Sequence, residues 1–176
     1  GDKCVARQTI ETADQALSIP LTEGTYTVYA IGGATSDAYN LPTQSAATPS
    51  MSIALKDGAS HTDLMVAQAN VQLLDGETNT LTLTMQRKVF LLQSILLKGL
   101  PAAATAVSVT LSTLYESLLG TDYAGSSAST INLTRSSDDN HTWLFSGTNY
   151  LVPPSGNTLV VTVRITKVDG TLTYAY

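Results

Sequence analysis

The sequence of 176 residues is long enough for one large domain or two small ones, and its 43% hydrophobic content excludes a disordered chain. Its net charge of −5, with only nine Lys and Arg residues, excludes clustered phosphate contacts and therefore predicts no nucleic-acid partner. A single cysteine excludes an internal disulfide framework and a cysteine-rich metal site.

The first part of the chain contains two predicted strands in polar surroundings. Residues 1–15 are polar and weakly patterned, and we expect them to form a tether rather than a core strand. The segment ALSIPL (16–21) is predicted to be a short strand at a sheet edge, where its proline is tolerated. The segment EGTYTVYAIGG (23–33) has side chains that alternate between the two faces of a strand, and glycines lie at both of its ends. It is the clearest strand pattern. Residues 34–50 are a polar loop without periodicity.

The middle of the chain continues with three strand patterns. MSIALKDG (51–58) indicates a strand followed by a turn, and DLMVAQANVQLLDGE (63–77) indicates a strand that is bent or bulged near Asn70. A third and much longer segment covers residues 80–98. Its apolar side chains share one parity and can face one side of a strand: Leu81, Leu83, Met85, Val89, Leu91, Ile95 and Leu97.

The length and charge of residues 80–98 predict a change of direction within them. At roughly 3.3 Å per residue, an unbroken strand would extend about 60 Å, far beyond the usual strand. Arg87 lies on the apolar parity, and a guanidinium is tolerated there where the strand leaves the core and reaches water or a carboxylate. We therefore predict that the strand switches sheets at Arg87 and Lys88. The alternative is a boundary between two sub-domains near residues 86–89.

Strand patterns dominate the rest of the chain as well. They are AVSVTLSTLY (106–115), STINLTRS (129–136), TWLFSG (142–147), NTLVVTVRITK (157–167) and GTLTYAY (170–176). VDG (168–170) predicts a hairpin between the last two, and leucine spacing makes STLYESLLG (112–120) the helical candidate. We therefore predict an all-β fold, an antiparallel β-sandwich formed by residues 16–176 with at most one or two short helical turns.

No residue pattern points to catalysis or to a bound cofactor. His61 and His141 lie in polar, turn-like contexts without the paired spacing of metal ligands, and we expect both to be exposed. Neither a nucleophile elbow nor a phosphate-binding loop is present. Trp143 lies inside a strand pattern and is predicted to be a core residue. We predict a non-catalytic protein with no cofactor and no metal ion.

Four segments follow one another in an order that resembles a known family. They are GTYTVYAIGG (24–33), HTDLMVAQANVQL (61–73), LTLTMQRKVFLLQSILLKGLP (81–101) and YLVPPSGNTLVVTVRITKVDGTLTY (150–174). In this order the chain resembles the fimbrillin-like proteins of Bacteroides and Porphyromonas relatives, in particular their fimbrial anchor and minor subunits.

The resemblance implies a Greek-key, transthyretin-like β-sandwich in a secreted lipoprotein of the cell surface or outer membrane. It also implies assembly into fimbriae by strand addition, with other fimbrial subunits or host and bacterial surface ligands as partners. The sequence GDK before Cys4 is not a lipidation context and no signal peptide is recognisable, so a lipid anchor would lie upstream of Gly1.

Strand addition needs an open strand edge, and the C-terminal pattern offers one. GTLTYAY continues its alternation to Tyr176 without a charge or proline that would block pairing. We predict that the assembly edge lies at Thr171, Thr173 and Ala175. The alternative function is a stand-alone cell-surface module that binds carbohydrate or protein.

Overall fold

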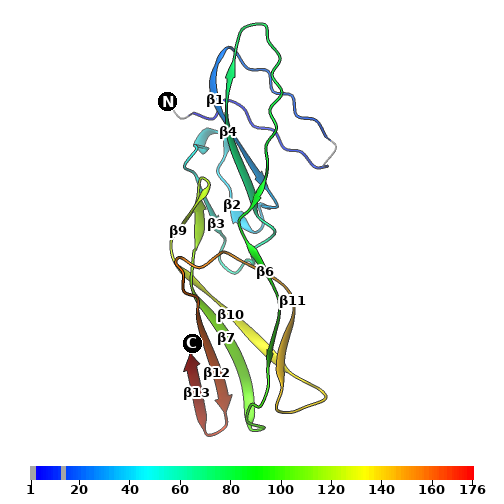
Figure 1. The fold of residues 1–176 in the computed structure, drawn as a ribbon, viewed down its shortest axis with the longest axis vertical. Helices are drawn as coiled ribbons and strands as arrows, with labels where there is room; N and C mark the ends of the chain where they lie inside the picture. The colour runs from blue at the N-terminus through cyan, green and yellow to red at the C-terminus, as the bar shows by residue number, and fades with distance from the viewer. Residues whose placement is uncertain (1–2, 13–14) are drawn as a thin grey trace.

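The protein is all-β, with antiparallel sheets and one short 3-10 turn (Figure 1). The computed structural model describes residues 3–12 and 15–176. Its strands are β1 (Gly24–Gly32), β2 (Tyr39–Asn40), β3 (Ser52–Leu55), β4 (Met65–Leu73), β5 (Gln86–Arg87), β6 (Phe90–Leu97), β7 (Ala104–Leu114), β8 (Ser117–Leu119), β9 (Asp122–Ala124), β10 (Ser127–Arg135), β11 (Trp143–Leu151), β12 (Val160–Lys167) and β13 (Gly170–Ala175). The 3-10 turn η1 covers Gln44–Ala46. The predicted fold class is confirmed.

Two hydrophobic clusters follow one another along the molecule. The N-side cluster is formed by the three-stranded sheet β1-β4-β5, the four-stranded sheet β2-β3-β8-β9 and the segments that follow them. Its buried members are Ala38, Tyr39, Ile53, Leu64, Val66, Val89, Leu118 and Val152. The C-side cluster belongs to the six-stranded sheet β13-β12-β7-β10-β11-β6, and its buried members are Ala104, Val107, Val109, Leu111, Leu114, Ile131, Leu133, Trp143, Leu151 and Ile165.

The six-stranded sheet folds over at β10 to enclose the C-side cluster. β10 pairs with β7 along residues 127–133 and with β11 only at residues 134–135. Beyond this corner, β6 and β11 lie on one side of the lower half of the molecule and β7, β12 and β13 on the other (Figure 1). Leu92 of β6 therefore packs in the same cluster as Val109 of β7 and Ile165 of β12. This is the arrangement of a β-sandwich.

Alternation along β7 decides which of its side chains enter the cluster. Val107 and Val109 are only 2% and 3% exposed. Ser108 and Thr110, the residues that follow each of them, point away from the cluster and are partly exposed. The Thr110 hydroxyl is 2.8 Å from the Thr130 hydroxyl on the neighbouring strand. β-Branched side chains suit such a half-buried pleated surface, so the local sequence and the sheet agree.

The chain crosses between the two clusters several times, and at three places the change falls between neighbouring residues. Adjacent residues belong to different clusters at Val89 and Phe90, at Leu114 and Tyr115, and at Leu151 and Val152. The second crossing follows Thr113, whose φ of 63° is unusual for a β-branched residue. Its hydroxyl donates to the Thr158 carbonyl at 2.8 Å. The crossings join the two halves by short, extended connections.

The helical candidate at residues 112–120 is wrong. Leu114 is the last residue of β7, and Leu118 lies in β8. Leu114 is buried in the C-side cluster and Leu118 in the N-side cluster, so their four-residue spacing does not reflect one helical face. The four-residue spacing looks helical, but the chain passes from the C-side cluster to the N-side cluster between these two leucines.

Three predicted strand features also differ from the structure. Residues 16–21 form no strand although the structure describes all of them, and Leu17 is 53% exposed. β4 has no bulge at Asn70, because it pairs with β1 over nine residues without a register shift. Residues 81–85 of the predicted long strand are not in a strand, and the part before β6 is reduced to the two residues of β5. The predicted VDG hairpin is present, since Lys167 pairs with Gly170.

The predicted tether is described only in part. Residues 1–2 and 13–14 lie outside the described residues, and residues 3–12 form no strand. The Arg7 guanidinium donates to the Pro42 carbonyl at 3.1 Å, which ties this segment to the loop before η1. Among the residues described, no helix has the length and apolar character needed to cross a membrane.

Candidate functional site

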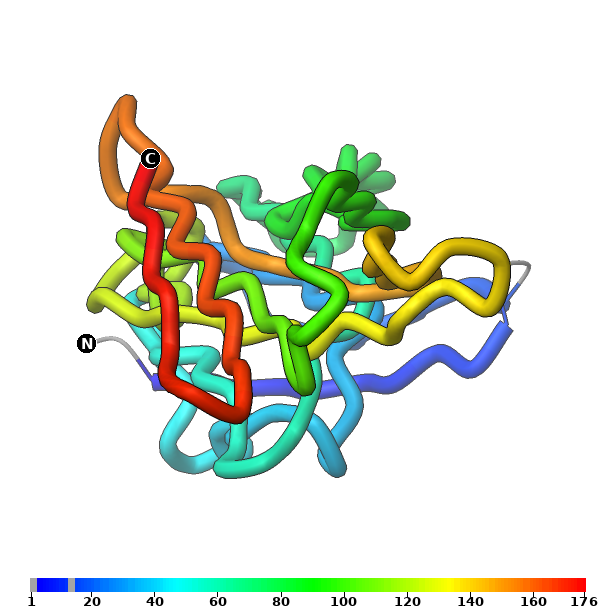
Figure 2. Tube along the Cα trace, turned by 90° about the horizontal axis from the view of Figure 1, so that it is seen from below, coloured from blue at the N-terminus to red at the C-terminus, as the bar shows by residue number. Residues whose placement is uncertain are grey.

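β13 lies at one edge of the six-stranded sheet and, among the described residues, pairs only with β12 (Figure 2). Just beyond it, Tyr176 exchanges two backbone hydrogen bonds with Val161, both of 2.9 Å. In an antiparallel pair the residues alternate between bonding the neighbour and pointing away from it. The N–H and C=O groups of Thr171, Thr173 and Ala175 therefore point to the open side of β13. The structure places the three predicted edge residues together on this open edge.

The two faces of β13 differ in how far their side chains are buried. Thr171, Thr173 and Ala175 are exposed on the outer face. On the inner face Leu172 packs against the C-side cluster, but Tyr174 is 45% exposed although it shares the parity of Leu172. The opposite layer therefore covers the start of β13 and leaves aromatic surface accessible towards its end.

The predicted switch residues lie where the chain leaves one sheet for another. Arg87 ends β5, in the three-stranded sheet, and β6 begins at Phe90 in the six-stranded sheet. The Arg87 guanidinium forms a two-point contact with the Asp63 carboxylate, Nε–Oδ1 2.6 Å and Nη2–Oδ2 2.8 Å. Hydrogen bonding to Asp63 raises the pKa of Arg87 above its usual value. The expected carboxylate partner of this guanidinium is thus present.

Lys88 and Tyr29 hold the β8–β9 hairpin against the three-stranded sheet. The Lys88 ammonium lies 5.4 Å from the centroid of the Tyr123 ring, and the Tyr123 hydroxyl donates to the Lys88 carbonyl at 3.3 Å. The Tyr29 hydroxyl donates to the Gly120 carbonyl in the hairpin turn. Burial, with a contribution from Asp122, raises the pKa of Tyr29 to about 12. Burial also raises the pKa of Tyr123, so both tyrosines stay neutral hydrogen-bond donors at physiological pH.

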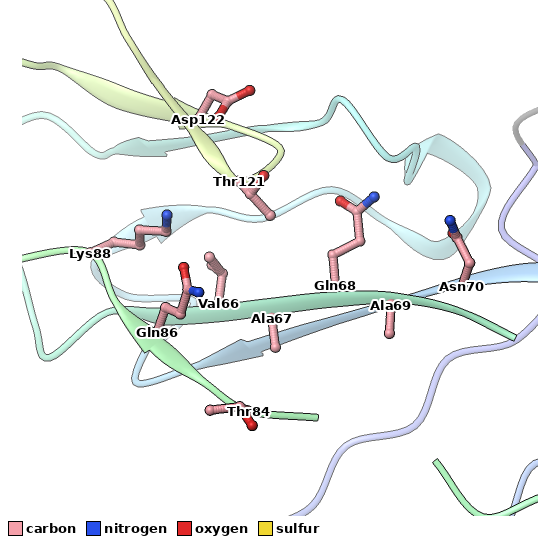
Figure 3. A pocket seen from close by; sticks show the side chains of 10 residues that line it. All are labelled: Val66, Ala67, Gln68, Ala69, Asn70, Thr84, Gln86, Lys88, Thr121 and Asp122. Carbon is pink, nitrogen blue, oxygen red and sulfur yellow. The ribbon is translucent and has the colours of Figure 1, made fainter. Parts of the chain in front are cut away.

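A groove of about 430 Å³ lies between β4 and this hairpin (Figure 3). It is lined by Val66, Ala67, Gln68, Ala69, Asn70, Thr84, Gln86, Lys88, Thr121 and Asp122. Gln68 and Asn70 point to the same side of β4, towards Thr121, while Thr84 sits on a segment that diverges from the strand. The lining offers amides, hydroxyls and one charge of each sign, which suits hydrogen bonding to an uncharged polar group.

His61 was predicted to be exposed, and this prediction is wrong. It is partly buried rather than exposed, and its Nδ1 is 3.2 Å from the hydroxyl of Tyr39. That hydroxyl accepts the Thr62 N–H at 3.1 Å, so its own hydrogen is free to be donated to Nδ1. Burial lowers the pKa of His61 and favours the neutral ring. His141 is exposed, as predicted.

The groove was not predicted, although one signal for it was in the sequence. VAQANVQ in β4 alternates small apolar residues with Gln68, Asn70 and Gln72, so one face of the strand carries a row of amides. Within the described residues, no three His, Cys, Asp or Glu side chains come together as a candidate metal site. The surfaces that stand out are strand edges and polar grooves, which suit binding of another polypeptide.

One family comparison matches nearly the whole chain. A family model described as "Fimbrillin-A associated anchor proteins Mfa1 and Mfa2" matches residues 1–175. No curated protein and no solved structure matches the chain.

Proposed function

Since the chain belongs to the family of fimbrillin-A associated anchor proteins, we propose that it is a non-catalytic structural subunit of bacterial surface fimbriae that joins a neighbour by strand addition at β13. The family points to a cell-surface protein whose partners are other fimbrial subunits. The open edge of β13 is the single observation that carries the strand-addition part of the proposal.

The geometry of β13 supports pairing with a strand from a neighbour. The backbone groups of Thr171, Thr173 and Ala175 point outwards and can bond a new strand along its length. Alternate side chains of that strand would then cover the accessible inner-face rings of Tyr174 and Tyr176, which are 45% and 77% exposed. Backbone hydrogen bonds and apolar cover would act together, as in other cases of strand addition.

Proline substitutions at the open edge test this proposal. Thr173→Pro and Ala175→Pro remove N–H groups that point away from β12, so they spare the hydrogen bonds between β12 and β13. We expect incorporation of both variants into cell-surface fibres, measured by immunoelectron microscopy, to fall well below that of the wild type. The melting temperature of the isolated protein should change little, because edge prolines are tolerated.

Matched controls separate the loss of the donor from the change of side chain. Thr173→Val and Ala175→Val keep the outward N–H groups and should be incorporated normally. Tyr174→Pro removes an N–H that points towards β12 and bonds it, so this variant should have a lower melting temperature. That result checks the assigned hydrogen-bond directions. Normal incorporation of both edge-proline variants would overturn the assignment of β13 as the assembly edge.

Attachment to the outer membrane is the remaining part of the proposal. A family of anchor proteins must hold a fibre to the cell, and we place the lipid anchor upstream of Gly1. Metabolic labelling of the cellular protein with a clickable fatty acid tests this point. A lipid-free protein that still sediments with outer membranes would show that attachment occurs by other means.

A further inference from the structure

β4 has a second edge that is open along most of its length. On this side it pairs with β5 only at Met65 with Arg87 and Val66 with Gln86. The Lys88 N–H donates to the Leu64 carbonyl at 2.8 Å, which fixes the alternation of the ladder. The N–H and C=O groups of every second residue after Val66, beginning with Gln68 and Asn70, therefore point to the side where β5 has ended. Both residues are exposed.

The chain's own residues 80–85 have the pattern of the strand that is missing there. Continuing the register of β5 would set Thr84 opposite Gln68, Leu83 opposite Ala69 and Thr82 opposite Asn70, and would bring Met85 opposite Ala67. Apolar residues would then face apolar residues, and threonines would face amides. Such agreement over a whole segment is what fixes register in a sheet.

At their Met85 end, residues 80–85 already lie close to the position in which they would pair with β4. The Met85 methyl group lies only 3.2 Å from where a Cβ atom on Gly32 would be, so its side chain is on the apolar face of the three-stranded sheet. Figure 3 shows the chain leaving β4 between Gln86 and Thr84, which makes this short stretch the hinge. Closing the hinge requires movement of residues 80–85 and of the loop at residues 74–79 that connects them to β4.

We propose that β4 carries a closable strand slot, in which residues 80–85 move between the diverged position and a position paired with β4. In the closed position the segment completes a longer third strand and fills the space beside Ala67 and Ala69. In the open position the backbone groups of Gln68 and Asn70 on this side have no hydrogen-bond partner among the described residues. The gain in hydrogen bonds on closing is opposed by the entropy lost on ordering the segment, so neither position is strongly favoured. This inference rests on the geometry of β4 and is independent of the proposed role of β13.

A disulfide between the two predicted partners tests the closed position. Ala69→Cys with Leu83→Cys, in a Cys4→Ser background, places thiols at a non-hydrogen-bonded pair, where Cβ atoms lie about 4.5–5.5 Å apart in a paired ladder. Ala69→Cys with Thr84→Cys is the matched control, because Thr84 would then face the opposite side of the sheet. We expect mild oxidation of the folded protein to cross-link the first pair about tenfold faster than the second.

Hydrogen exchange of the cross-linked protein provides the second measurement. The amides of Gln68 and Asn70 should exchange more slowly after cross-linking and return to their original rates after reduction. Equal cross-linking rates for the two cysteine pairs would overturn the proposal. A cross-link that forms without added protection of the Gln68 and Asn70 amides would overturn it too, since the segment would then be near β4 without being paired to it.

Discussion

Tyr39 links the packing of the N-side cluster to the protonation of His61. Its ring is 1% exposed in the cluster, and its hydroxyl accepts from the Thr62 amide while standing 3.2 Å from the His61 ring. Only the neutral imidazole can accept a hydrogen bond at Nδ1, and burial already disfavours the charged ring. Acidification should therefore weaken this part of the fold through one identifiable residue.

We predict that the free energy of unfolding falls on acidification because of His61. The pKa of His61 is lowered in the folded protein, so the unfolded chain, with a pKa of about 6.5, takes up the proton first as the pH falls. Its stabilising contribution is complete above that pH and is lost as the pH drops towards the folded pKa. Urea unfolding between about pH 7.5 and about pH 5.5 should show this decline in the wild type and a smaller one in His61→Gln. Parallel declines in the two proteins would assign the effect to other groups.

The connection from β5 to β6 shows how one short element is held at a crossing between clusters. The polar side of this connection carries the contact of Arg87 with Asp63, with the Arg87 side chain 59% exposed. The apolar side carries Val89, which is 6% exposed in the N-side cluster, immediately before Phe90 in the other cluster. Exposed ion pairs contribute little because water screens them, whereas buried methyl groups contribute in proportion to their area.

We predict that Val89, and not Arg87, anchors this crossing energetically. Val89→Ala removes two buried carbon groups and should lower the free energy of unfolding by about 2 kcal/mol. Arg87→Ala should have a much smaller effect, which would shrink further at high salt. Urea titrations of the two variants at low and high salt give the comparison. If Arg87→Ala costs as much as Val89→Ala, the ion pair rather than burial fixes the strand switch at Arg87 and Lys88.

The whole molecule consists of two hydrophobic clusters, and the chain crosses between them several times. The N-side cluster takes most of its residues from the first half of the chain, but it also includes Leu118 and Val152 from the second half. A simple division near residues 86–89 would therefore separate Leu118 from the residues it packs against. We propose two folding units that follow the clusters, with β8 and β9 belonging to the first unit.

Trp143 allows the two units to be followed separately. It is the single tryptophan and lies 5% exposed in the C-side cluster, so its fluorescence reports that cluster. Ile53, which is 1% exposed in the other cluster, can be shortened to Ala at a cost of about 2–5 kcal/mol. We predict that Ile53→Ala lowers the midpoint seen by circular dichroism and leaves the tryptophan midpoint nearly unchanged.

A variant of the second cluster serves as the control for this prediction. Ile165→Ala, at a residue that is 3% exposed in the same C-side cluster as Trp143, should shift the tryptophan midpoint directly. If Ile53→Ala shifts both midpoints equally, the two clusters unfold as one cooperative unit.

The sequence by itself determined the local structure of most of the chain. The strands of β1, β7, β10, β12 and β13 follow from alternation and turn residues, because both signals act between neighbours along the chain. The position of Thr171, Thr173 and Ala175 on a strand was predictable for the same reason. The burial of Trp143 followed from its place within an alternating strand.

Only the tertiary structure decided which strands pair and what covers each face. Leu114 and Leu118 enter different clusters, and residues 16–21 have strand alternation but form no strand in the described structure. The burial of His61 depends on Tyr39, which is distant in sequence, and the groove beside β4 depends on the approach of the β8–β9 hairpin. These outcomes depend on segments that lie far apart in the sequence, and a local pattern carries no information about the partner that a sheet edge or a side chain will meet.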